Sequence, residues 1–271
     1  MQGKLLCGFF ILSNLFAGAQ IPVLPEGRHH FIVIAHRGDH TEVPENTMAS
    51  YEYAIGNAVD YVEIDLRTTR DSVLVIMHDE TVDRMTNGKG KLSELRYADL
   101  RLLRVRDISK DSGKIYQIPS FAEVLKTCKG KINIYLDFKN ASVLQTYRLI
   151  REYGMEKHVI VYINEPFQYT EWRRLVPDMP LMVSLPEGIK NGQDLIKFLS
   201  ESPVALLDGD YTDYTTDVFK TASTLGLAVW PDIQGPDEAN NWDKALELGF
   251  MGLQTDHPLA LISYLKKKAL R

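Results

Sequence analysis

The chain contains little cysteine and carries no excess of positive charge, and each shortage counts against a class of function. Its 271 residues include two cysteines, Cys7 and Cys128, and the formal net charge is −5. No cysteine lies near the motifs described below and no HExxH pattern is present, so the sequence does not favour a zinc site. Nucleic-acid binding requires a large basic patch, and we therefore expect no nucleic-acid partner.

Long apolar runs are also scarce, and one of them lies at the N-terminus. Lys4 precedes an apolar run from Leu5 to Leu12, and the small residues Ala17-Gly18-Ala19 precede Gln20. This pattern predicts a secretory signal peptide over residues 1–19 that is cleaved after Ala19, because the run is too short to span a bilayer. An uncleaved N-terminal anchor is the alternative.

Cleavage after Ala19 would change both the cysteine content and the location of the protein. It would remove Cys7 and leave Cys128 without a partner for an intrachain disulfide. It would also leave no segment for stable membrane insertion, so we expect a secreted or periplasmic protein. The mature chain would begin with a Pro-rich, polar segment, residues 20–30, which we expect to be a loose arm.

Short apolar runs recur along the rest of the chain at a regular spacing. Helix-like segments of about a dozen residues separate most of these runs, as in a parallel α/β fold. Eight runs could be parallel strands, and they cover residues 31–35, 61–66, 132–136, 159–163, 181–185, 204–207, 227–230 and 250–253. This alternation predicts a TIM (β/α)8 barrel formed by one domain, residues 20–271, with a doubly wound sheet as the alternative.

A ninth apolar run, residues 73–78, does not fit the parallel pattern. The turn that precedes it, Thr68 to Ser72, is shorter than the crossover of about a dozen residues that parallel strands require. We therefore expect an antiparallel hairpin with the run 61–66, within an insertion that covers about residues 67–118 after the second strand. This insertion should contain a helix from Ser93 to Leu103. A short helix with Ser120 as its N-cap should follow.

Acidic residues stand at the ends of the predicted strands, where a TIM barrel carries its chemistry. Glu63 and Asp65 are two residues apart on one strand, so their side chains should point to the same face. Asp137, at the end of the third strand, would add a third carboxylate. Three carboxylates are the hard oxygen ligands that Ca²⁺ and Mg²⁺ prefer.

Basic residues and histidines stand beside these acids. Arg37 and Lys139 would place positive charge next to the predicted cation, where arginine suits bidentate contact with phosphate. His36 follows the first strand, and the hairpin would bring His78 close to Asp65. Two imidazoles can act as acid and base near neutral pH. The combination predicts a phosphodiesterase site.

Several short motifs of the chain together resemble those of a known family. The motifs are His36-Arg37-Gly38, Pro44-Glu45-Asn46-Thr47, Glu63-x-Asp65, Thr69-x-Asp71 through His78-Asp79, Ile118-Pro119, Lys139 and Thr255-Asp256-x-Pro258. They span about residues 31–260 and resemble the glycerophosphodiester phosphodiesterase family. The resemblance implies a TIM barrel with an insertion after the second strand, and hydrolysis of a small-molecule glycerophosphodiester to an alcohol and glycerol phosphate.

The resemblance also implies a role for each site residue. It makes His36 and His78 the acid and base, Glu63, Asp65 and Asp137 the ligands of a divalent metal, and Arg37 and Lys139 the phosphate contacts. Trp230, near the seventh strand, is expected either to bind the substrate by stacking or to fill the barrel.

The chain departs from the family pattern at two positions. The family usually has glutamate where this chain has Asp137, and threonine where Pro231 follows Trp230. The shorter Asp137 favours Ca²⁺ over Mg²⁺, because Ca²⁺ tolerates irregular shells. The alternatives are a related lipid phosphodiesterase, of phospholipase D or phosphoinositide type, and an inactive barrel that binds phosphodiesters. The sequence makes no prediction of the head group or the oligomeric state.

Overall fold

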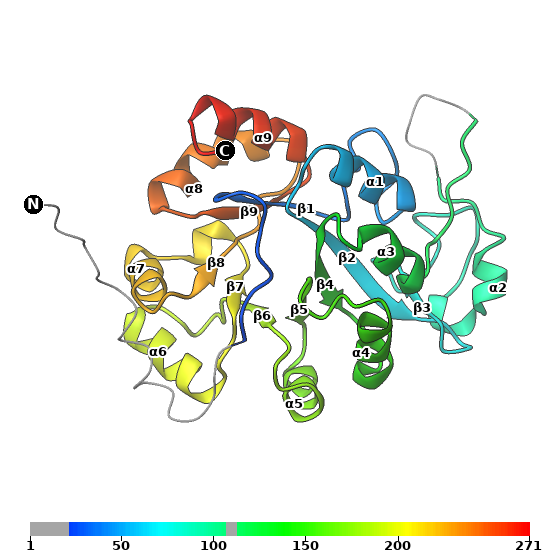
Figure 1. Ribbon diagram of the computed structural model, residues 1–271, viewed down its shortest axis with the longest axis horizontal. Helices are drawn as coiled ribbons and strands as arrows, with labels where there is room; N and C mark the ends of the chain where they lie inside the picture. Colours follow the sequence, from blue (N-terminus) through cyan, green and yellow to red (C-terminus); the bar gives the residue numbers. More distant parts are fainter. Residues whose placement is uncertain (1–21, 107–112) are drawn as a thin grey trace, which may run out of the picture.

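The computed structural model describes residues 22–106 and 113–271, and the predicted signal peptide lies outside these ranges. Eight parallel strands surround a common axis (Figure 1), in the order β8-β7-β6-β5-β4-β2-β1-β9. They are β1 (Ile32–Ala35), β2 (Tyr61–Thr68), β4 (Asn133–Phe138), β5 (Val159–Ile163), β6 (Leu181–Ser184), β7 (Leu206–Asp208), β8 (Ala228–Val229) and β9 (Gly252–Thr255). Beyond the end of β8, Asp232 forms a parallel bridge with Gln254 of β9, which closes the ring. The predicted TIM barrel is confirmed.

Helices surround the barrel on its outer side (Figure 1). They are α1 (Met48–Gly56), α3 (Phe121–Cys128), α4 (Val143–Glu152), α5 (Pro166–Leu175), α6 (Gly192–Glu201), α7 (Thr216–Thr224), α8 (Trp242–Leu248) and α9 (Pro258–Lys267). Ser120 caps α3 as predicted, and its hydroxyl accepts a hydrogen bond from the Glu123 N–H at 3.2 Å. Among the helices of the described ranges, none combines the length and apolar character that crossing a bilayer requires.

Alternation along the strands separates an outer apolar layer from the barrel interior. On β2, Val62, Ile64 and Leu66 pack in the core beneath the helices, so Glu63 and Asp65 face the axis. Deeper in the barrel, a second apolar cluster fills the interior, formed by Ile32, Ile34, Tyr61, Tyr135, Ile160, Met182, Leu206 and Trp230. The polar residues at the carboxyl ends of the strands therefore lie above an apolar floor.

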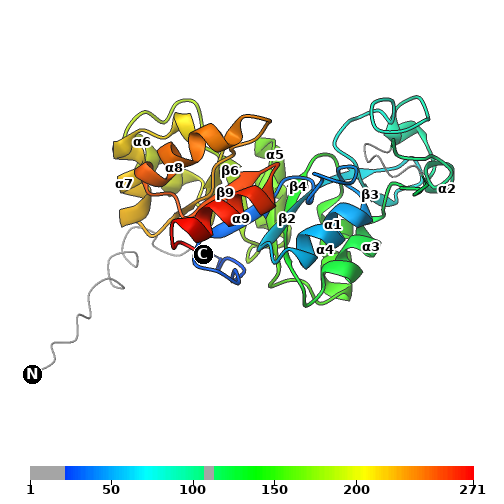
Figure 2. The same cartoon turned by 90° about the horizontal axis from the view of Figure 1, so that it is seen from above.

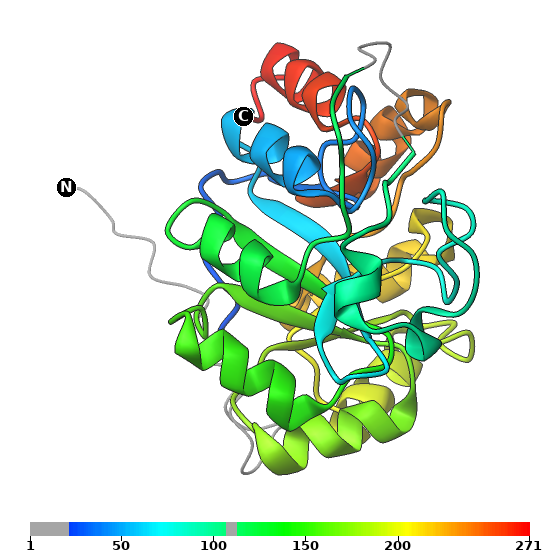
Figure 3. The ribbon, with the colours of Figure 1, turned by 90° about the vertical axis from the view of Figure 1, so that its right-hand side faces the viewer.

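The insertion after β2 begins with the predicted hairpin. Strand β3 (Leu74–Ile76) runs antiparallel to β2, with Leu66 opposite Ile76. The insertion projects from one side of the barrel, with helix α2 (Tyr97–Leu100) at its outer edge (Figure 2), and Figure 3 views the molecule from this side. Its own apolar cluster contains Val75, Val82, Leu92, Leu100, Val105 and Ile118, among others.

The helix that we predicted from Ser93 to Leu103 is wrong as a continuous element. A 3-10 turn, η2 (Leu92–Glu94), and the single turn of α2 replace it. Leu95 and Arg96 between them have extended backbone angles. The carbonyl of Leu95 accepts a hydrogen bond from the Arg70 N–H at 2.9 Å. Pairing with the hairpin therefore uses the carbonyl that a continuous helix would need.

Residues 22–30, the described part of the predicted arm, are not loose as their composition predicted. The backbone N–H groups of Arg28 and His29 both donate to the buried carboxylate of Asp60 at 3.1 Å. Asn133 donates to the Glu26 carbonyl at 2.9 Å. Leu24 packs against the apolar cluster of the barrel interior. Residues 24–29 thus cover the end of the barrel opposite the predicted site, and Figure 1 shows this segment in dark blue crossing the strands.

Candidate active site

Three carboxylates meet at the carboxyl ends of β2 and β4. One oxygen from each of Glu63, Asp65 and Asp137 lies within 4.8 Å of the others. The two strands are parallel neighbours with Asp65 opposite Asp137, which explains the convergence. Glu63 is 3% exposed and Asp65 is 1% exposed. The sequence-predicted ligand set is therefore brought together by the fold.

The electrostatics of this cluster suit a bound cation. Burial, followed by the charges of Asp65 and Asp137, raises the pKa of Glu63 well above its usual range. Burial and the charge of Asp65 also raise the pKa of Asp137. Like charges held this close repel one another, and a divalent cation among them would remove the repulsion. Hard oxygen donors in this number fit Ca²⁺ or Mg²⁺.

Arg37 reaches the cluster through a turn in an unusual backbone conformation. Arg37 has a φ of 52° and Gly38 a φ of 81°, values that glycine adopts without steric cost. A Cβ at Gly38 would also lie 2.4 Å from the Ser50 hydroxyl. This turn directs the Arg37 N–H to Glu63 Oε2 at 2.7 Å. Strain at a binding site of this kind is often functional.

The two predicted phosphate-binding cations already contact the carboxylates. The Arg37 guanidinium donates to Glu45 at 2.8 Å and lies 3.6 Å from Asp65, but its buried Nε has no hydrogen-bond partner. Lys139 Nζ lies 3.3 Å from Asp65 and contacts Asp137. Burial would lower the pKa of Lys139, but these carboxylates outweigh it and raise that pKa.

Each predicted catalytic histidine is held by a carboxylate through Nδ1. His36 Nδ1 lies 2.7 Å from Asp256 Oδ1, and His78 Nδ1 lies 2.8 Å from Asp79 Oδ1. Although burial opposes the shift, the contact with His36 lowers the pKa of Asp256 to about 2. A carboxylate on Nδ1 fixes the ring and its tautomer, so Nε2 is the nitrogen available for proton transfer.

Further polar residues orient these groups. Asn46 donates to Asp65 and Asn164 donates to Asp137, each at 2.7 Å. Arg84 donates to Asp79 at 2.7 Å and to Glu45 at 2.8 Å. Glu45 also accepts from Arg37, so it bridges two arginines. Sequence reasoning missed Arg84 and Asn164, although Asn164 directly follows the run 159–163 and so stands at the same rim as the other strand-end residues.

Seven of the eight predicted site residues line a single cavity of about 250 Å³ at this end of the barrel, namely His36, Arg37, Glu63, Asp65, His78, Asp137 and Lys139. The rest of its lining is also polar and comprises Tyr135, Tyr162, Asn164, Asp208, Asp232, Gln234 and Gln254. Such a cavity can hold a small, polar molecule.

Trp230, the eighth predicted residue, lies elsewhere. Its ring packs on Tyr61, with the ring centroids 5.1 Å apart, in the apolar cluster beneath the cavity. A Cβ at Gly252 would lie 2.2 Å from the same ring, so β9 is closely fitted to it. The predicted substrate contact of Trp230 is therefore not supported, and its other predicted role, filling the barrel, matches this placement.

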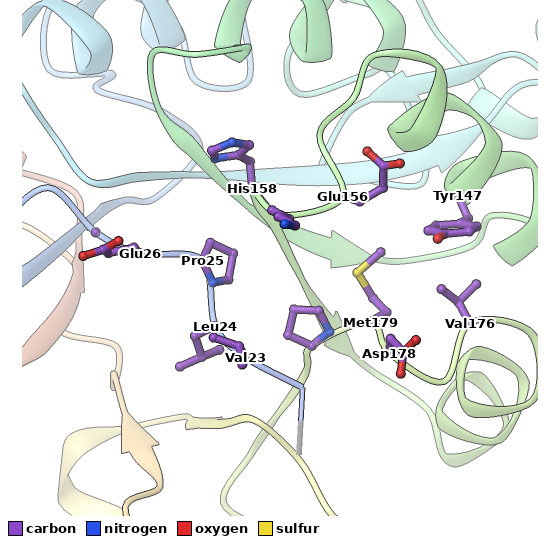
Figure 4. A pocket seen from close by; sticks show the side chains of 13 residues that line it. Val23, Leu24, Pro25, Glu26, Tyr147, Glu156, His158, Val176, Asp178 and Met179 are labelled. Atoms are coloured by element: carbon purple, nitrogen blue, oxygen red, sulfur yellow. The ribbon is translucent and has the colours of Figure 1, made fainter. Parts of the chain in front are cut away.

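A larger cavity, of about 810 Å³, lies at the opposite end of the strands between the segment before β1 and the loops that precede β5 and β6. Figure 4 shows that its carboxylates, Glu26, Glu156 and Asp178, are spread around the rim rather than gathered. Its histidine, His158, is held by Asn133 at 2.9 Å. The residues suited to acid–base chemistry and cation binding are instead clustered in the smaller cavity.

Comparisons with known proteins agree with this geometry. Residues 36–260 match the model of the glycerophosphoryl diester phosphodiesterase family. The chain is 26% identical to a glycerophosphodiester phosphodiesterase of Caldanaerobacter subterraneus, over 87% of this chain and 98% of the relative. It is 29% identical to one of Bacillus subtilis, over 92% of this chain and 90% of the relative.

Solved structures with the same fold include a glycerophosphodiester phosphodiesterase from Agrobacterium tumefaciens. That structure has a TM-score of 0.76 at 22% identity and covers 86% of this chain and 99% of its own. An Oleispira antarctica phosphodiesterase, solved with its product sn-glycerol-3-phosphate, has a TM-score of 0.75 at 21% identity, over 87% of this chain and 96% of its own.

Proposed function

The chain belongs to the glycerophosphoryl diester phosphodiesterase family, and we propose that the cavity at the mouth of its barrel hydrolyses glycerophosphodiesters to an alcohol and glycerol phosphate. The observation that carries the proposal is the meeting of three carboxylates, two phosphate-binding cations and two carboxylate-held histidines in one cavity. Each part has a task in phosphodiester hydrolysis.

Charge balance supports a metal requirement. When ionised, Glu63, Asp65 and Asp137 outnumber the cations Arg37 and Lys139 by one negative charge, which would repel a phosphodiester anion. A divalent cation bound to the three carboxylates would reverse the excess to one positive charge and would stabilise negative charge developing on the phosphoryl oxygens. It would also weaken the hold of Asp65 and Asp137 on Lys139, so that Lys139 could turn to the substrate.

The chain's own residues account for binding and proton transfer. Arg37, whose Nε lies 3.6 Å from Asp65 and makes no hydrogen bond, and Lys139 hold the non-bridging phosphate oxygens. One of the two histidines takes the proton of the attacking oxygen through Nε2. The other gives a proton to the alcohol oxygen as its bond to phosphorus breaks. The net reaction consumes one water molecule.

A turnover assay separates this function from its alternatives. The protein, stripped with a chelator, is mixed with glycerophosphocholine and titrated with Ca²⁺ or Mg²⁺, and release of glycerol phosphate is measured. We expect no release in chelator, recovery with metal, and a modest preference for Ca²⁺. Binding without turnover would indicate an inactive barrel, and turnover of phospholipids alone would indicate a lipid phosphodiesterase.

We also propose that the protein is exported after removal of residues 1–19. The hydrogen bonds that tie residues 26–29 to the barrel begin shortly after that site, so cleavage after Ala19 would leave the whole barrel intact. The intact mass of the mature protein tests this proposal. A mass that includes residues 1–19 would contradict it.

A further inference from the structure

A second pair of carboxylates lines the same cavity and has no task in the mechanism above. Asp208 ends β7 and Asp232 follows β8, on the side of the barrel away from β2 and β4 (Figure 1). The Tyr135 hydroxyl donates to Asp208 Oδ2, and the Gln254 amide donates to Asp232 Oδ1. Each carboxylate thus has one oxygen engaged by a neutral donor. We call Asp208, Asp232 and Gln254 the acidic subsite.

The acidic subsite holds buried acceptor atoms without donors. Asp208 is 1% exposed and Gln254 is 4% exposed, yet Asp208 Oδ1 and Gln254 Oε1 have no hydrogen-bond partner. Buried acceptors in this condition are uncommon, because leaving them unpaired costs free energy. Across the described part of the chain, no lysine or arginine forms an ion pair with either carboxylate, unlike the cluster on β2 and β4. The site therefore lacks a positively charged donor.

A proton shared by the two carboxylates would pair only one of the two unpartnered acceptor atoms. Burial and the charge of Asp232 raise the pKa of Asp208 well above its usual range, and burial raises the pKa of Asp232 to about 6. Both shifts favour a proton held between the two carboxylates. That proton can satisfy Asp208 Oδ1, but Gln254 Oε1 would still lack a donor.

The number and kind of acceptors decide between possible cations. A divalent metal ion is held best by several ionised carboxylates, as in the cluster on β2 and β4, whereas a proton shared by Asp208 and Asp232 would remove one of the two charges here and leave Gln254 Oε1 without a donor. A primary ammonium group has three N–H donors and one positive charge, so it can donate to Gln254 Oε1 and balance the negative charge that the carboxylate pair keeps. A quaternary ammonium group has no N–H to donate.

We propose that the acidic subsite binds the primary ammonium group of the substrate's alcohol, so that the enzyme prefers glycerophosphodiesters of short amino alcohols. The inference rests on the proposed function, since the acidic subsite and the phosphate-binding residues line one cavity. Asp232 is also close enough to His36 for their charges to interact, which places the ammonium group on the same side as one of the histidines.

The test compares three substrates that differ at one end. They are glycerophosphoethanolamine, its propyl analogue with a methyl group in place of the ammonium, and glycerophosphocholine. For wild type we expect kcat/KM to favour the ethanolamine diester over the propyl diester by at least about 10-fold, as a charged hydrogen-bonding site does. The kcat/KM for glycerophosphocholine should not exceed that for the propyl diester in the same way.

Two isosteric variants and a matched control locate the effect. Asp208→Asn and Asp232→Asn should each reduce the ratio of ethanolamine to propyl turnover towards one. Asp210→Asn, the same change on an exposed residue beyond β7, should keep the wild-type ratio. If Asp208→Asn does not fold, inhibition of propyl diester hydrolysis by free ethanolamine, and its loss in Asp232→Asn, gives the same information.

The outcomes distinguish this inference from the proposed function. If no glycerophosphodiester is hydrolysed, the proposed function itself fails. If all three diesters are hydrolysed equally, or if choline matches ethanolamine, the function stands and the ammonium site is overturned. If Asp208→Asn keeps the wild-type ratio, the pair only shares a proton. If Asp232→Asn alters metal activation instead of the ratio, the site holds a metal ion, and the proposal is also wrong.

Discussion

His36 and Asp256 are 220 positions apart in the chain, yet His36 Nδ1 lies 2.7 Å from Asp256 Oδ1. The contact exists because β1 pairs in parallel with β9, with Ala35 opposite Thr255. The N–H of Gly235 fixes the other oxygen of Asp256 at 2.8 Å. The ring of His36 is therefore oriented by the pairing of the first and last strands of the barrel.

Replacing either catalytic histidine should nearly abolish turnover. We expect His36→Ala and His78→Ala each to lower kcat by at least roughly 10²-fold, because each removes a general acid or base. His158→Ala, at the opposite end of the barrel, is the matched control and should retain wild-type kcat. Near wild-type turnover at every pH in either catalytic variant would remove that histidine from the mechanism.

Asp256 should act by positioning His36. Asp256→Asn keeps the size of the side chain but removes the negative charge beside Nδ1, so we expect kcat to fall by about 10-fold or more while KM changes little. Steady-state kinetics over a range of pH measure this split. Asp243→Asn, an exposed change near the C-terminus, should change neither parameter. A rise in KM alone would mean that Asp256 contributes to binding instead.

Asp137 should determine metal affinity. Asp137→Asn removes a charged ligand and should raise the metal concentration needed for half-maximal activity strongly, whereas Asp137→Glu keeps the charge and should be tolerated far better. Activity against titrated Ca²⁺ and Mg²⁺, after chelator treatment, measures the difference. An unchanged metal dependence in Asp137→Asn would show that Asp137 is not a ligand.

The titration of Asp232 should make the free energy of unfolding fall as the pH rises. Burial raises its pKa to about 6 in the folded protein, against about 3.9 in an unfolded chain. The folded state therefore binds this proton more tightly, and its stabilisation is complete below about pH 4 and is lost as the pH rises through about 6. Asp232→Asn resembles the protonated form and does not titrate.

The free energy of unfolding of Asp232→Asn, relative to wild type, should consequently rise by up to about 3 kcal/mol between pH 4 and 7. Urea titrations at several pH values measure this difference, and a constant offset in the variant does not affect the slope. Asp210→Asn should give a flat difference. A difference in unfolding free energy between Asp232→Asn and wild type that does not change with pH would contradict the raised pKa of Asp232.

Trp230 should matter for stability and little for substrate binding. Its ring fills the space between Tyr61 and Gly252 beneath the cavity, so Trp230→Leu should cost about 2–4 kcal/mol by leaving a void. The midpoint of thermal unfolding and KM, measured on the same preparation, separate the two roles. A raised KM with unchanged stability would restore the stacking role.

Local patterns predicted the strands and the hairpin because the side-chain period is visible in the sequence. Val62, Ile64 and Leu66 alternate with Glu63 and Asp65, so one face had to be apolar and the other acidic. A turn as short as Thr68–Ser72 allowed only antiparallel pairing. We could predict that Glu63, Asp65 and Asp137 converge because functional residues of a TIM barrel lie at the carboxyl ends of its strands.

Features set by distant contacts could not be predicted in the same way. Asp256 contacts His36 because β1 pairs with β9. Trp230 lies beneath the cavity because of the register of β8 against its neighbouring strands. The segment around Arg28 is ordered by Asp60, which its own Pro-rich composition does not indicate. Likewise, the Leu95 carbonyl pairs with Arg70, and this contact overrides the helical pattern around it.

The pairing of β1 with β9 also sets the order of events during synthesis. Strand β1 is among the first parts of the barrel to leave the ribosome, but one of its edges has no partner until Thr255 has been added. At about 5–20 residues per second, that wait lasts on the order of 10–40 s. Throughout it, the nascent chain exposes an apolar strand edge, Ile32–Ala35, to which a chaperone or an export factor could bind.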